Sequence, residues 1–229
     1  MDTPTLLIIP GYHGSSGLHW QRWLHAQVPG SELIDGIDWE QPVLASWAER
    51  VRTALSAATT PLTVVAHSFG CLATIVAVAD RPDRIADLVL VAPADPDRSD
   101  FKGLKPLASV DDRFDLSLAL PLRKLQVPGL LVGSRNDPWL GLEQAQRLAQ
   151  TLGLDFHDAG AVGHINTESG FGPWPWLLET LQRRAQARQP GLSPELVPTL
   201  KKGRGSALAA VRQLTREQKE KPFIRRKRF

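Results

Sequence analysis

The sequence predicts an α/β fold, with a doubly wound, mostly parallel sheet of six strands and helices on both faces. Two observations carry this prediction. Short runs rich in Leu, Ile and Val recur along the chain between Gly, Pro and Asp residues, and segments with helical periodicity separate these runs. Such alternation is typical of βαβ units, in which a helix connects two parallel strands.

The six strands are expected at residues 5–9, 32–34, 62–66, 87–91, 129–132 and 155–157. Between the second and third strands, apolar residues recur at helical spacing from Leu44 to Ala58, and Glu49 and Arg50 fall on the opposite side. The same periodicity recurs over residues 142–152. In a doubly wound sheet, functional sites form in the loops at the carboxyl ends of the strands. Candidate functional residues are therefore expected in those loops.

Length and charge indicate one main domain of residues 1–188 and a basic tail of residues 189–229. The chain has 229 residues, of which 42% are hydrophobic, and this suffices for one sizeable core. From Pro190 onward there are eleven Lys or Arg and three Glu, a net charge of +8, whereas the rest of the chain carries −5. The tail contains repeated Pro and Gly, and we expect it to be disordered or partly helical. Its charge suits weak contact with nucleic acid or anionic lipid, although a solvated terminus is the simpler interpretation.

The cysteine content and the N-terminus indicate a soluble, cytoplasmic protein. Cys71 is the only cysteine, so no disulfide within the chain and no cysteine-based metal site is expected. The N-terminus carries Asp2 where a signal peptide would be basic, and its apolar run ends at Pro10. No segment approaches the roughly 20 apolar residues of a membrane helix. We expect neither a metal nor a cofactor, and we interpret Cys71 as a small buried residue.

The stretch VVAHSFGCLA, residues 64–73, predicts a strand, a sharp turn and a helix, with Ser68 on the turn. A nucleophile on such a turn needs small residues two positions before and after it, because larger side chains would strike the neighbouring strand and helix. Ala66 and Gly70 meet this requirement, with one methyl group more than the G-x-S-x-G pattern. Free N–H groups at the start of the helix would stabilise a developing oxyanion. Ser68 is therefore the candidate nucleophile.

A serine nucleophile needs a histidine base and a carboxylate that orients the base. Asp137 follows the fifth predicted strand in GSRNDPW, and His164 follows the sixth in AGAVGHINTESGFG. Both lie at carboxyl ends of strands, in the order Ser, Asp, His that accompanies a nucleophile on this kind of turn. We predict Asp137 as the acid and His164 as the base. Asp137 as a simple helix cap, with Asp95 as the acid, is the alternative.

The glycine-rich loop PGYHGSSGLHW follows the first predicted strand and can supply one N–H of an oxyanion hole. The backbone N–H of Phe69 is expected to supply the other. Tyr12 is the preferred donor in the loop, and His13 is the alternative. His13, Trp39 and Trp139 are predicted to line the substrate pocket, as large side chains in or near carboxyl-edge loops. The connection over residues 93–126 is long enough to cover part of this site.

Four motifs, PGYHGSSGLHW, AHSFGC, SRNDPW and GHINTESGFGPWP, together resemble the small α/β-hydrolase family of YdeN-type bacterial proteins and retinoblastoma-binding serine hydrolases. The resemblance covers residues 5–184. It implies a minimal α/β-hydrolase fold without the two leading strands of larger members, and it implies Ser68, Asp137 and His164 as nucleophile, acid and base. Ala66 departs from the more usual glycine. Retinoblastoma binding is not implied, because no L-x-C-x-E motif surrounds Cys71.

These residues predict a cofactor-independent serine hydrolase that cleaves a small-molecule carboxylic ester or thioester through an acyl-enzyme. An amidase or peptidase with the same triad is the second interpretation, because the triad can also protonate an amine leaving group. A non-catalytic interaction module that acts through its basic tail is the third.

Overall fold

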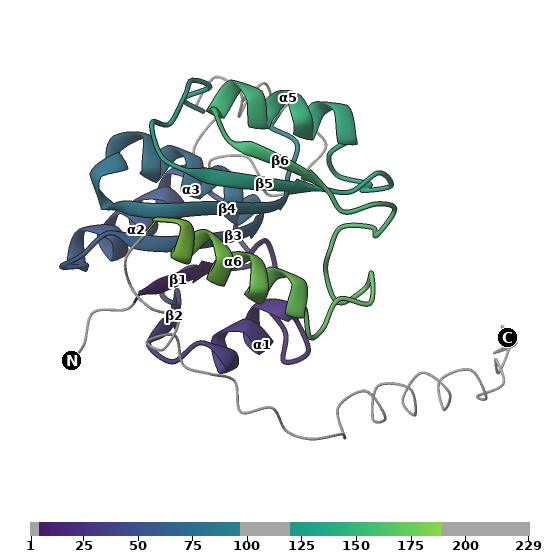
Figure 1. The fold of residues 1–229 in the computed structure, drawn as a ribbon, viewed down its shortest axis with the longest axis horizontal. Helices are drawn as coiled ribbons and strands as arrows, with labels where there is room; N and C mark the ends of the chain where they lie inside the picture. Colours follow the sequence, from purple (N-terminus) through teal and green to yellow (C-terminus); the bar gives the residue numbers. More distant parts are fainter. Residues whose placement is uncertain (1–4, 97–119, 189–229) are drawn as a thin grey trace, which may run out of the picture. The chain divides into compact units, whose positions relative to one another are not determined.

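The computed structural model describes residues 5–96 and 120–188, which form a six-stranded sheet between two layers of helices (Figure 1). The strands are β1 (Leu6–Ile9), β2 (Ser31–Leu33), β3 (Leu62–Ser68), β4 (Ile85–Pro93), β5 (Gly129–Gly133) and β6 (Asp155–Asp158). Their order in the sheet is β2-β1-β3-β4-β5-β6, and each neighbouring pair is parallel. The predicted doubly wound sheet is confirmed, and these six strands are parallel throughout rather than mostly parallel.

The helices divide between the two faces of the sheet (Figure 1). They are α1 (Trp20–Gln27), α2 (Leu44–Ala57), α3 (Phe69–Asp80), α5 (Leu142–Leu152) and α6 (Pro175–Arg188), with a short 3-10 helix η1 (Pro82–Arg84) before β4. Alternate residues of β1 show the division. Leu7 and Ile9 belong to the core shared with α2, α3 and α5, whereas Leu6 and Ile8 belong to the core shared with α1 and α6. Because both faces are covered, the inner strands β1, β3, β4 and β5 are mostly apolar and buried, whereas the edge strands β2 and β6 are more polar.

The observed strand bounds differ most from the predicted ones where β3 and β4 lie side by side. The predicted third strand ends at residue 66, but β3 continues to Ser68, and β4 spans residues 85–93 rather than 87–91. His67 and Ser68 pair with Val91 and Pro93 of β4. Pairing with the neighbouring strand therefore extends β3 through two polar residues. Side-chain pattern alone gives no signal for this extension.

A buried ion pair connects α6 to the sheet. Asp87 on β4 is fully buried, and Arg184 on α6 donates to its two carboxylate oxygens from Nε and Nη2, each at 2.9 Å. Arg184 also donates from Nη1 to Asp155 on β6 at 3.1 Å. The hydrogen bonds to Asp87, the largest cause, raise the pKa of Arg184. Because either charge would be costly if it were buried alone, the pair fixes α6 against β4 and β6.

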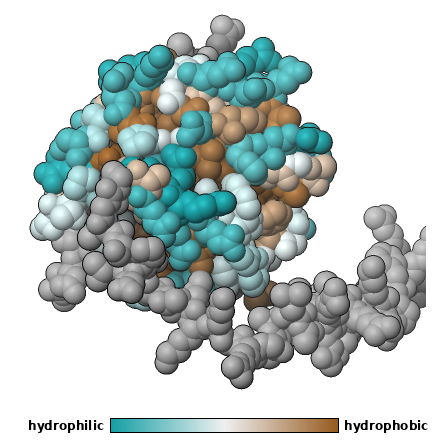
Figure 2. All heavy atoms as spheres, in the orientation of Figure 1, coloured by the Kyte–Doolittle hydropathy of each residue, from teal (hydrophilic) through white to brown (hydrophobic). Residues whose placement is uncertain are grey.

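The side of α6 that faces away from the sheet is polar. Glu179, Arg183 and Gln186 are exposed. Figure 2 shows hydrophilic residues over much of the same face, with smaller apolar areas between them. The helix is thus amphipathic, with its apolar side against the sheet.

Two predicted features lie outside the described residues. They are the basic tail of residues 189–229 and residues 97–119 of the connection that is long enough to cover part of the site. The division into a domain of residues 1–188 and a tail stays a prediction, as does the cytoplasmic location. Across residues 5–96 and 120–188, none of the helices has the length and apolar character needed to cross a membrane.

Candidate active site

Ser68 lies at the junction of β3 and α3 in a backbone conformation that residues other than glycine rarely adopt. Its φ is 52° and its ψ is −127°. Strain of this kind costs on the order of 1–3 kcal/mol and persists where the surrounding packing imposes it. Two glycines leave room for the turn. A Cβ on Gly11 would lie 2.7 Å from Ser68 Cβ, and a Cβ on Gly70 would strike the carbonyl oxygen of Pro10.

Ala66 occupies the position where the nucleophile turn usually has glycine, and its extra methyl group is accommodated. Ala66 is fully buried and pairs in the sheet with Ile9 and Leu90. It belongs to the apolar core shared with α2 and α3. The requirement for a small residue is therefore stricter at Gly70, where backbone would be struck, than at Ala66.

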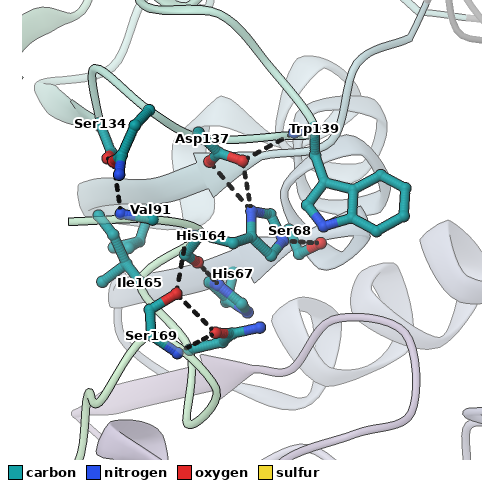
Figure 3. Close-up of polar contacts among 12 residues, drawn as sticks. His67, Ser68, Val91, Ser134, Asp137, Trp139, His164, Ile165 and Ser169 are labelled. Atoms are coloured by element: carbon teal, nitrogen blue, oxygen red, sulfur yellow. Dashed lines mark hydrogen bonds and ion pairs between the residues drawn. The ribbon is translucent and has the colours of Figure 1, made fainter. Parts of the chain in front are cut away.

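Ser68, His164 and Asp137 form a continuous line of hydrogen bonds (Figure 3). Nε2 of His164 lies 2.9 Å from Ser68 Oγ, and Nδ1 of His164 lies 3.0 Å from each carboxylate oxygen of Asp137. Because an ionised carboxylate only accepts, Nδ1 carries a hydrogen, and Nε2 is available to accept the Ser68 proton. The side chains of Asp137 and His164 are 1% and 8% exposed, so water screens their interaction little.

Asp137 also closes the turn after β5. Its Oδ1 accepts the backbone N–H of Trp139 at 2.9 Å while the same carboxylate faces His164. Asp137 is not the cap of the following helix, because Gly141 is the N-cap of α5 and the hydrogen bond from Trp139 closes a turn before that helix. Because Asp137 occupies the Nδ1 side of the imidazole, no position remains there for the alternative acid, Asp95.

His164 lies in a loop after β6 whose backbone has positive φ on both sides. The φ angles of Gly163 and Ile165 are 65° and 49°. The N–H of Gly163 donates to Asn136 Oδ1 at 2.7 Å, and the N–H of His164 donates to Ser169 Oγ at 3.0 Å. Side chains from the β5 loop and from the loop itself therefore hold the backbone around His164.

Two further histidines, His67 and His19, lie behind His164 and have no assigned role in the predicted site. The ring of His67 lies 4.9 Å from that of His164 and 5.2 Å from that of His19, and both histidines are buried. Burial is the main cause that lowers the pKa of His19 to about 4 and the pKa of His67 well below its usual value, and the charge of His164 adds to both effects. Both rings are therefore neutral near pH 7. The sequence signal for His67 was its position directly before the candidate nucleophile, at the end of a predicted buried strand.

The backbone around Tyr12 distinguishes the two candidate donors of the oxyanion hole. The N–H of His13 donates to the carbonyl oxygen of Trp39 at 3.0 Å and is therefore occupied. Within the described residues, neither the N–H of Tyr12 nor that of Phe69, the first residue of α3, has a hydrogen-bond acceptor. This arrangement favours Tyr12 over His13 as the donor.

The three predicted pocket residues occupy different environments. The ring of Trp139 lies 6.1 Å from the ring of His164 and is 36% exposed (Figure 3). Trp39 packs beside Gly14 and against the ring of Trp47 at 5.1 Å, so it supports the loop that contains Tyr12. His13 is exposed, and its Nδ1 lies within hydrogen-bond distance of Glu40 Oε2, at 2.9 Å. Trp139 therefore lies beside the candidate base, His164.

Cys71 is buried in α3, as predicted, and burial raises the pKa of its thiol. The thiol is therefore protonated and unreactive near pH 7. Among the described residues, no group of three or more His, Cys, Asp or Glu side chains is placed to hold a metal ion.

Residues 6–183 match the protein family described as serine hydrolase. Among solved structures, a hydrolase described as YdeN-like from Pectobacterium atrosepticum is 33% identical, covers 81% of this chain and 92% of its own, and superposes with a TM-score of 0.70. The ydeN gene product of B. subtilis is 19% identical, with 80% and 100% covered and a TM-score of 0.65. Carboxylesterase CesB from Bacillus subtilis is 16% identical, with 83% and 85% covered and a TM-score of 0.56. None of the curated proteins matches the chain.

Proposed function

Because this chain belongs to the serine hydrolase family, we propose that Ser68, His164 and Asp137 are its catalytic residues and that it cleaves carboxylic esters or thioesters. The likeness to a YdeN-like hydrolase confirms the predicted family resemblance. One observation carries the proposed roles, namely the line of hydrogen bonds from Asp137 through His164 to Ser68 at 3.0 and 2.9 Å. The description of one structural relative as a carboxylesterase makes esters the first substrates to test.

In the proposed reaction, Nε2 of His164 takes the proton of Ser68 as Oγ attacks the carbonyl carbon of the substrate. Asp137 stabilises the imidazolium that forms, and the N–H groups of Phe69 and Tyr12 receive the oxyanion. His164 then protonates the departing alcohol or thiol, which leaves an acyl group on Ser68. A water molecule, deprotonated by His164, attacks this acyl-enzyme. The bond between the acyl group and Ser68 Oγ then breaks, His164 returns the proton to Oγ, and the carboxylic acid is released.

The bond that the protein cleaves is tested with an ester, a thioester and an anilide that share one acyl group. We expect the ester and the thioester to be hydrolysed with higher kcat/KM than the anilide, because an amine leaves only after protonation, which demands more of His164. Rates are measured on the full chain. An anilide cleaved as fast as the ester would support the amidase interpretation instead.

We infer that Trp139 contacts the alcohol part of an ester, because the leaving oxygen must lie within reach of His164 Nε2 and the indole lies beside that ring. Replacing Trp139 with Ala should lower kcat/KM for an ester of a bulky apolar alcohol about 5- to 30-fold, which corresponds to about 1–2 kcal/mol of lost apolar contact. The methyl ester of the same acid is the control, since its alcohol is too small to use the indole.

The variant Trp139→Phe should retain most of the preference for the bulky ester, because it keeps an aromatic ring at this position. The N–H that Trp139 donates to Asp137 belongs to the backbone and is present in both variants. An equal loss on the bulky ester and the methyl ester would contradict the proposed contact and would point to a disturbed Asp137.

A further inference from the structure

The backbone carbonyl of His164 is held by a side chain from the strand that carries Ser68. Nε2 of His67, on β3, lies 3.0 Å from this oxygen, and the two residues are 97 positions apart in the sequence. A carbonyl oxygen only accepts hydrogen bonds, so His67 carries its hydrogen on Nε2 and donates it. The contact therefore joins the residue before Ser68 directly to the backbone of the residue whose ring contacts Ser68.

This loop needs such support because its own conformation is unfavourable. Ile165, which is β-branched and fully buried, has a φ of 49°, and a positive φ in a β-branched residue is strained. The carbonyl of Ile165 accepts a hydrogen bond from Trp20 Nε1 at 2.8 Å. Two consecutive carbonyls, those of His164 and Ile165, are thus held by buried donors from β3 and α1.

A neutral ring suits the position of His67. His67 is buried with its ring 4.9 Å from that of His164, which becomes a cation in the proposed reaction. The other titratable ring that faces His67 is His19, at 5.2 Å. A cationic donor at this position would repel the imidazolium of His164, whereas a neutral imidazole supplies the hydrogen bond without a charge.

We propose that His67 is a positioning residue, whose Nε2–H fixes the His164 carbonyl and so keeps His164 Nε2 within hydrogen-bond reach of Ser68 Oγ. The inference rests on the proposed roles of Ser68 and His164. His67 touches neither the substrate nor the transferred proton, so its effect is expected on the chemical step. A misplaced base lowers the rate of that step, while the groups that bind the ester stay unchanged.

Three substitutions at position 67 test the proposal through ester hydrolysis by the full chain. His67→Leu removes the donor, and we expect kcat to fall about 10- to 100-fold with KM within about twofold. His67→Gln places an amide N–H where Nε2 stands, and it should restore kcat to within a few-fold of wild type. His67→Asn is also polar, but its amide is one bond too short to reach the carbonyl, and it should resemble His67→Leu.

The pair His67→Gln and His67→Asn keeps the test valid if His67→Leu fails to fold, since both amides are polar and the thermal midpoint of each verifies its folding. Equal kcat in the Gln and Asn variants, or a loss confined to KM, would overturn the proposal. The wild type and Ser68→Ala are measured in the same series. If Ser68→Ala is inactive and His67→Asn keeps the kcat of wild type, this inference is overturned and the proposed function stands.

Discussion

Ser68→Ala protein is expected to hydrolyse a model ester about 10⁶-fold more slowly than wild type, because the substitution removes the oxygen that forms the acyl-enzyme. The residual rate would come from the oxyanion N–H groups and from substrate binding. Alanine and serine meet the same backbone strain at this position, where φ is 52°. The thermal midpoint should therefore change little, and lost activity will not reflect unfolding.

The measurement is kcat at saturating ester concentration for the full chain. Ser46→Ala is a suitable control, since Ser46 lies on α2 and its hydroxyl contacts only the local backbone carbonyl of Val43 among the described residues. Wild-type activity is expected for that variant. Hydrolysis by Ser68→Ala at a rate near wild type would contradict the assignment of Ser68.

Asp137→Asn is expected to lower kcat about 10⁴-fold. An asparagine amide can donate to Nδ1 of His164, which favours the tautomer with its hydrogen on Nε2. That tautomer cannot accept the Ser68 proton. Both carboxylate oxygens of Asp137 lie 3.0 Å from Nδ1, so the substitution changes this contact directly.

The control for Asp137 is Asp95→Asn, which tests the alternative acid that the sequence left open. We expect that variant to keep kcat within a few-fold of wild type. A larger loss in Asp95→Asn than in Asp137→Asn would reverse the assignment. The same ester and the same protein concentration serve both variants, so the two losses compare directly.

The sheet could be predicted because its inner strands, β1, β3, β4 and β5, are buried on both faces and so appear as apolar runs between helical segments. The ends of β3 and β4 could not be predicted, since His67 and Ser68 extend β3 by pairing with Val91 and Pro93. The positions of Asp137 and His164 followed from a simple rule, that loops at carboxyl ends of parallel strands share one edge of the sheet. The distances that join Asp137, His164 and Ser68 could be obtained only from the folded structure.

Other features of the site depend on contacts that no local pattern encodes. Tyr12 is already the preferred donor from the sequence, but the structural reason to prefer it over His13, a backbone hydrogen bond from His13 to Trp39, comes only from the folded chain. The contacts of the Trp39 ring with Gly14 and Trp47 likewise appear only in the folded chain, and its place in the substrate pocket stays a prediction. No local pattern shows that His67 and His19 are both buried, with the ring of His67 beside those of His164 and His19.

Reaction of the full chain with a fluorophosphonate probe, followed by mass spectrometry of its peptides, tests the assignment of the nucleophile most directly. The probe forms a stable adduct with an activated serine. We predict one adduct on the peptide that contains Ser68 in wild-type protein, and none on that peptide in Ser68→Ala. An adduct on a different serine, or equal labelling of wild type and Ser68→Ala, would contradict the assignment of Ser68 as the nucleophile.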